Sequence, residues 1–265
     1  MHELSNFIHL PLIGLAIGII VGLTGVGGGS LMTPILVAGL GIPPAIAVGT
    51  DLLFASITKS FGAAAHWRAG NVAKRLLLVL ILGSLAGAGL AFALIHGLKP
   101  NIDSLNRVIR SALAVALFGT AIALMLRPWL LRMRRPLTLP IAANDIDSQK
   151  VWPTMALGLA IGAVVTLSSI GAGAIGVTAL LLLHPALPIS RVVGTDIAYA
   201  VPLTAVAGLA HASVGHVDGG LLAGLLVGSV PGILIGAHVS RRVPEIATRS
   251  LLVAALSFAG AKLVA

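Results

Sequence analysis

The chain has 265 residues, of which 57% are hydrophobic and only 9% are charged. Soluble domains carry about 25% charged residues, so this composition excludes a soluble globular domain. Several continuous apolar runs reach the ~20 residues that cross a bilayer as a helix, which predicts an all-α polytopic membrane protein rather than a β-barrel. The basic residues behind the net charge of +9 lie in short connectors, so they indicate membrane topology and no nucleic-acid partner.

The apolar runs divide the chain into two halves. A polar segment, 127–150, separates a first transmembrane repeat, 1–126, from a second, 151–265. Each half opens with a short pair of apolar runs, predicted to be either a re-entrant hairpin or two tilted helices. The runs in chain order are 10–21, 31–40, 45–65, 76–95, 108–126, 151–169, 175–183, 192–210, 221–239 and 251–264.

The two halves repeat each other at a constant offset of 145 residues. The tetrapeptide Val-Gly-Thr-Asp at 48–51 recurs at 193–196 without a gap. Further identities at this offset join Pro43 to Pro188, Thr33 to Thr178, His66 to His211, Gly70 to Gly215, Val72 to Val217, Gly83-Ser84 to Gly228-Ser229 and Gly87 to Gly232. One offset maintained over some sixty residues indicates an internal duplication.

The distribution of Lys and Arg predicts how the copies are oriented. Connector 66–75 carries three basic residues, whereas its counterpart 211–218 carries neither Lys nor Arg. Segment 127–150 holds four arginines and a lysine, and cytoplasmic loops are enriched in such residues. We therefore expect 66–75 and 127–150 to be cytoplasmic, and 211–218 and both termini to be external. Corresponding connectors on opposite faces define an inverted-topology repeat.

Glycine clusters separate the two runs of each opening pair. The first glycine loop (24–30) reads Thr-Gly-Val-Gly-Gly-Gly-Ser, and a weaker copy, the second glycine loop (168–176), carries alanines in place of two of the glycines. A dinucleotide loop is excluded, because serine replaces the third glycine and no βαβ unit surrounds it. Close helix packing remains one interpretation. The other is an opened backbone whose N–H groups bind an anion at a helix N-terminus. The candidate residues are Thr24, Gly25, Gly27, Gly28, Gly29, Ser30, Ser168, Ser169, Gly171 and Gly173.

Three ionisable residues lie inside apolar runs. Asp51 and Asp196 recur at the same place in both copies; each is either a helix-start acid or a protonatable group on a transport pathway. Lys59 follows Asp51 by two helical turns and has Thr204 as its counterpart. It is either a buried partner of Asp51 or a counter-charge for an anion.

These features resemble the TauE/SafE family of sulfite and sulfonate transporters. The resemblance covers nearly the whole chain except 127–150, and rests on Gly25–Pro34, on the Gly-Thr-Asp that follows a proline-containing turn, on Ala-Gly-Asn-Val at 69–72, and on their repetition. It implies a transporter of small sulfur-containing anions such as sulfite or sulfoacetate. Its expected location is the cell (inner) membrane, as a multi-pass protein.

The expected mechanism is alternating access, with one central anion site between the glycine loops and proton coupling through Asp51 and Asp196. An anion channel is the alternative within membrane proteins. An intramembrane enzyme is less well supported, because no Ser/His or HExxH arrangement is present, so no catalytic residue is proposed. No cofactor is expected, and the scattered histidines show no metal-ligand spacing. The expected partners are the anion and the lipid bilayer, and the sequence leaves a homodimer open.

Overall fold

The computed structural model describes residues 2–24, 29–98, 101–133, 150–240 and 245–264, and these consist of helices without strands. The first half forms α1 (His2–Thr24), α2 (Gly29–Pro34), the π-helix η1 (Ile35–Gly39), α3 (Pro44–Arg68), α4 (Lys74–Leu98) and α5 (Ile102–Met133). The second half forms α6 (Val151–Ser168), α7 (Ala174–Leu183), α8 (Ile189–Ser213), α9 (Gly219–Ser240) and α10 (Glu245–Val264). The predicted all-α fold is thereby confirmed.

Within the described residues, five helices are long and apolar enough to cross a membrane: α4, α5, α6, α8 and α9. The two helices that open each half are not of equal, short length as the sequence predicted. Helix α1 has 23 residues and α6 has 18, whereas α7 has only 10. Helix α1 extends beyond the apolar run 10–21 in both directions, because backbone hydrogen bonds set the length of a helix while hydropathy marks only its apolar part.

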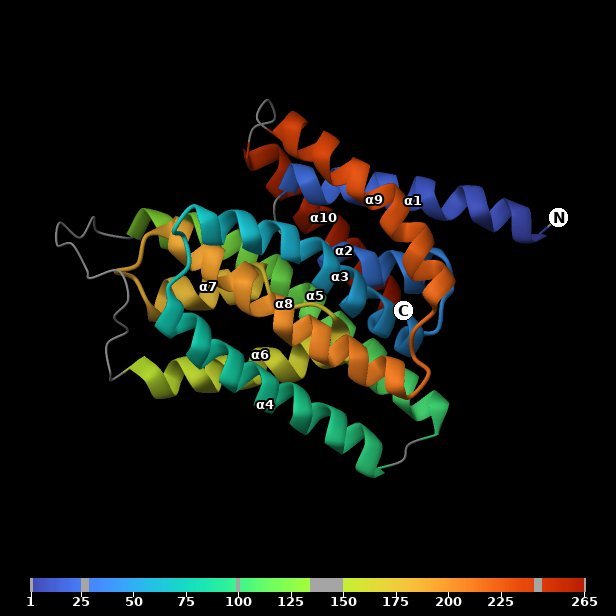
Figure 1. Ribbon diagram of the computed structural model, residues 1–265, viewed down its shortest axis with the longest axis horizontal. Coiled ribbons are helices and arrows are strands. Elements are labelled where there is room, and N and C mark those ends of the chain that lie inside the picture. The colour runs from blue at the N-terminus through green and yellow to red at the C-terminus, as the bar shows by residue number, and fades with distance from the viewer. Residues whose placement is uncertain (1, 25–28, 99–100, 134–149, 241–244, 265) are drawn as a thin grey trace.

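Helices α1 and α9 lie side by side, as do α4 and α6, with α3 and α8 between the two pairs (Figure 1). Small residues explain both close contacts. A methyl group on Gly18 of α1 would meet the backbone of Ser229 in α9, and one on Gly162 of α6 would meet the backbone of Ser84 in α4. Ser84 and Ser229 correspond at the 145-residue offset. Gly18 and Gly162 therefore serve close helix packing, as is common for small residues in membrane proteins.

Helices α3 and α8 occupy equivalent positions in the two copies and run antiparallel. Near one end of the pair, Gly49 packs against the backbone of His216, which follows α8; near the other, Gly194 packs against the backbone of Asn71, which follows α3. The two contacts correspond to each other, because Gly49 and Gly194, like Asn71 and His216, are related by the 145-residue offset. Between them, the Ser56 hydroxyl donates to the Val201 carbonyl at 3.5 Å, again across 145 residues.

Two hydrogen bonds also join the copies reciprocally. The backbone N–H of Asp218, before α9, donates to the Thr50 hydroxyl at 3.1 Å. The backbone N–H of Ala73, before α4, donates to the Thr195 hydroxyl at 2.9 Å. Each copy thus caps a helix of the other. Two copies in inverted orientation would make such reciprocal contacts, and the inverted repeat itself stays a prediction.

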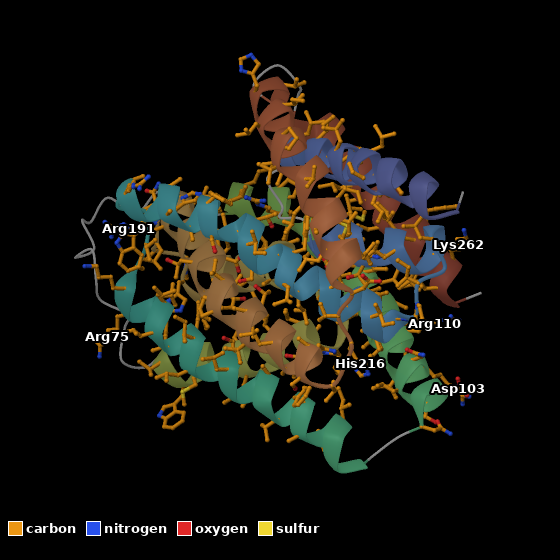
Figure 2. All side chains as sticks on the ribbon, turned by 45° about the vertical axis from the view of Figure 1, so that its right-hand side comes forward. Arg75, Asp103, Arg110, Arg191, His216 and Lys262 are labelled. Carbon is orange, nitrogen blue, oxygen red and sulfur yellow. The ribbon has the colours of Figure 1, made fainter. Side chains whose placement is uncertain are left out.

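Ionisable side chains mark the two ends of the bundle. Arg75 and Arg191 lie at one end, and Asp103, Arg110 and His216 lie at the opposite end (Figure 2). The connectors before α4 and before α9 are therefore at opposite ends of the bundle. That these ends face opposite sides of a membrane, and which of them faces the cytoplasm, stay predictions.

Candidate functional site

The two glycine loops differ in how much of them can be described. Residues 25–28, and with them the candidates Gly25, Gly27 and Gly28, lie outside the described residues. Thr24 ends α1 while Gly29 and Ser30 begin α2, but their side chains also lie outside the described part. The site is therefore built from the second glycine loop and the helices around it.

The second glycine loop is a buried break between α6 and α7. Ser169 has φ 58°, and Gly171 and Gly173 both have φ 131°, a conformation that only glycine adopts without strain. The Ser168 hydroxyl accepts from the Ile170 N–H at 3.2 Å and lies 2.7 Å from the Val164 carbonyl, to which it donates. Ser168 thus holds the turn together, whereas the Ser169 hydroxyl has no hydrogen-bond partner in the structure.

The first-copy part of the site lies on α3 and α2. Asp51 is fully buried and accepts a hydrogen bond from the Thr33 hydroxyl at 2.5 Å. The Ser169 hydroxyl lies beside the same carboxyl without reaching hydrogen-bond geometry. Lys59 is 8% exposed, and its ammonium group donates to the Ala172 carbonyl at 3.3 Å. Lys59 of the first copy therefore contacts the glycine loop of the second.

The second-copy part of the site lies on α8 and α7. Asp196 and Tyr199 are buried, and Tyr199 follows Asp196 by one helical turn. A methyl group on Gly176 of α7 would clash with Asp196 Oδ1 and lie 3.1 Å from the Tyr199 hydroxyl, so both atoms face the same glycine. Asp196 interacts electrostatically with Lys59 and with Arg127 of α5.

These side chains form one central cluster, defined as Asp51, Lys59, Ser169, Asp196 and Tyr199. Lys59 interacts electrostatically with both aspartates, which come from equivalent positions on crossing helices. Four buried polar atoms of the cluster have no hydrogen-bond partner among the residues that the structure describes: Asp51 Oδ1, Ser169 Oγ, Asp196 Oδ1 and Tyr199 Oη. Buried polar groups are nearly always bonded, so this concentration indicates a place for water, protons or a bound ligand.

The positive charges of the cluster lie around the start of α7. Gly173 is the N-cap residue of α7, and Lys59 reaches the carbonyl of the preceding residue. A helix N-terminus carries about half a positive charge and exposes N–H groups, which favours an anion. An ammonium group, a helix N-terminus and two carboxyls in an apolar interior can bind an anion together with protons.

The structure also decides between interpretations that the sequence left open. Pro43 and Pro188 are the N-cap residues of α3 and α8, so Asp51 and Asp196 lie in the second helical turn or beyond and cap neither helix. Sequence reasoning missed Tyr199, although it is the chain's single tyrosine and its spacing from Asp196 places both on one helix face. It also treated Arg127 as part of a loop, whereas α5 continues to Met133.

His211 and His216 lie near the end of the bundle that also holds Asp103 (Figure 2). His211 bonds through Nε2 to the Thr166 carbonyl at 3.0 Å, and its ring lies 5.7 Å from that of His216. Partial burial lowers the pKa of His216, which lies between α8 and α9. Across the described ranges, no three His, Asp or Glu side chains gather as a metal site.

The fold and the central cluster define a multi-pass helical membrane protein that encloses a buried group of ionisable side chains. The family described as "Sulfite exporter TauE/SafE" matches residues 10–263. The chain therefore belongs to the TauE/SafE family and is a membrane transporter, as the resemblance implied.

Curated relatives support this assignment over almost the whole length. The chain is 39% identical to "Probable membrane transporter protein YjnA" of Bacillus subtilis (strain 168), over 97% of this chain and 99% of that protein. It is 28% identical to "Probable membrane transporter protein YdhB" of the same organism, over 92% of this chain and 94% of that protein. No solved structure matches the chain.

Proposed function

We propose that this protein moves a small sulfur-containing anion, such as sulfite, sulfoacetate or a related sulfonate, across the cell membrane together with a proton. The observation that carries the proposal is the meeting of Lys59 with the start of α7 beside two buried aspartates. The sulfur chemistry of the substrate comes from the family, whereas the residues supply the preference for an anion and a proton.

The anion would bind between Lys59 and the second glycine loop. Gly171 and Gly173 leave the backbone uncovered there, and Ser169 supplies a hydroxyl without a present partner. The first glycine loop, through Gly27, Gly28 and Gly29, would complete the site from the other copy. Since alanines replace two glycines of the second loop, we expect the two loops to contribute unequally.

The proton would bind to Asp51 or Asp196. A negatively charged substrate beside an ionised carboxylate is repelled, so binding of the anion favours the protonated acid. Linkage then requires the converse, that protonation strengthens binding of the anion. We therefore expect affinity for the anion to rise as the pH falls, and a proton gradient to drive transport.

Alternating access would open one end of the bundle at a time. The end near Thr50 is held by the bond from Asp218, and the end near Thr195 by the bond from Ala73. These equivalent contacts join the two copies at opposite ends of the antiparallel pair α3 and α8. Breaking one while keeping the other would expose the central cluster to one side of the membrane.

The test is uptake of sulfoacetate into proteoliposomes with an acidic exterior. Its sulfonate and carboxylate stay ionised near neutral pH, so a pH effect reports on the protein. Asp51→Asn or Asp196→Asn should abolish gradient-driven uptake while substrate exchange continues. Normal driven uptake in both single variants would exclude proton coupling through these residues. Flux that does not saturate would indicate an anion channel instead.

A further inference from the structure

The two halves of the central cluster are chemically unequal. Tyr199 on α8 corresponds to Phe54 on α3 at the 145-residue offset, and both side chains are fully buried. Each follows its aspartate by three residues. Only the second-copy aspartate therefore has a hydroxyl one helical turn away, just as only the first copy carries the lysine.

The Tyr199 hydroxyl has an unusual environment for a buried phenol. Buried tyrosine hydroxyls normally find a hydrogen-bond partner. This one lies beside the Asp196 carboxyl, yet neither Oη nor Asp196 Oδ1 has a partner at hydrogen-bond geometry. Gly176 is the neighbour on α7, and its lack of a side chain leaves the two oxygens adjoining the first turn of that helix.

We infer that Tyr199 is an anion-binding residue that couples the protonation of Asp196 to binding of the anion, an inference that rests on the proposed function. A phenol has one O–H donor and can accept in return. With Asp196 ionised and the site empty, the phenol donates to the carboxylate. With Asp196 protonated, the acid donates to Tyr199 Oη, and the phenol proton turns to the oxygen of the bound anion. No covalent bond changes, and the incoming proton resides on Asp196.

The charged groups around this pair are consistent with that exchange. Lys59 of α3 and Arg127 of α5 interact with Asp196, and Asp51 of α3 interacts with the same lysine. The positive groups attract the anion but have no acceptor lone pair, so neither can receive the proton of the acid. Tyr199 is the neighbour of Asp196 that can both accept from the acid and donate to the anion.

The test measures binding of sulfoacetate to purified protein at several pH values, together with the melting temperature. For Tyr199→Phe we expect binding at acidic pH to weaken by about 10- to 150-fold, the range for one hydrogen bond to a charged group. The increase of affinity on acidification should also flatten. The matched control is Thr204→Val on the same helix, whose hydroxyl already bonds to the Ala200 carbonyl at 2.8 Å; it should keep both affinity and pH dependence.

The other possible results distinguish a failure of the inference on Tyr199 from a failure of the proposed function. Unchanged affinity in a folded Tyr199→Phe protein would overturn the inference and leave the proposed function intact. Weaker binding with the pH dependence of the native protein would assign Tyr199 as a ligand only and overturn the coupling. A native protein that binds neither sulfoacetate nor sulfite would refute the proposed function itself, and the inference with it.

Discussion

The role of Lys59 gives the sharpest test of the anion site. We consider Lys59→Met, which keeps an unbranched side chain of similar length and removes the charge. The lysine is 8% exposed and its nitrogen reaches the loop before α7, so a bound anion would meet an almost dehydrated ammonium group. A hydrogen bond to a charged group contributes about 1.5–3 kcal/mol. At 1.4 kcal/mol for each factor of ten, Kd should rise by about 10- to 150-fold.

The assay is calorimetric binding of sulfite and sulfoacetate, with the melting temperature measured on the same preparation. Stability should also fall, because the substitution removes the counter-charge of buried Asp51 and one of the two positive groups that interact with Asp196. Thr204→Val is again the control, since Thr204 stands at the equivalent position of the second copy and bonds only within its own helix.

A structural role would give a different result. If Lys59 only neutralises the aspartates, the triple variant Lys59→Met, Asp51→Asn, Asp196→Asn should recover both stability and affinity, because buried ion pairs can often be replaced as a unit without loss. If Lys59 binds the anion, the triple variant should recover the melting temperature but not the affinity. Native affinity in the single variant Lys59→Met would refute the reasoning.

Two further predictions follow from the glycines and the connectors. Gly176→Ala should abolish transport and lower the free energy of unfolding by about 1–3 kcal/mol, because its methyl group would clash with Asp196 Oδ1. The control is Gly89→Ala on α4, whose added methyl group would meet no atom within 4 Å and should leave transport unchanged. Transport by a Gly176→Ala protein would show that the site does not include α7. Ala69 and Ser213 are both exposed, and the chain has no native cysteine. Single cysteines introduced at these two positions should be labelled from opposite sides of the membrane. Labelling of both from the same side would contradict the inverted topology.

The sequence by itself predicted the class and the family, both of which are confirmed, and it contains a repeat at a constant offset of 145 residues. Continuous apolar runs have one stable solution in a bilayer, the helix, because every backbone polar group must be bonded within the segment. Lys59 and Asp51 could be placed on nearly one helix face from their spacing alone, since 3.6 residues per turn is a local property. The glycine clusters could be located, but the sequence did not decide between packing and an opened loop. The structure resolves that question for the second loop, where Gly171 and Gly173 have positive φ, while Gly18 and Gly162 serve packing.

Only the tertiary structure decided which residues of the two copies meet. That Lys59 reaches Ala172, and that Asp196 lies close enough to share this lysine with Asp51, depends on the antiparallel crossing of α3 and α8. The crossing is fixed by contacts between distant segments, such as Gly49 against the backbone beyond α8, which leave no local pattern in the sequence. The role of Tyr199 likewise depends on the tertiary structure, because only the structure shows that its hydroxyl and Asp196 Oδ1 lie together without hydrogen-bond partners among the described residues.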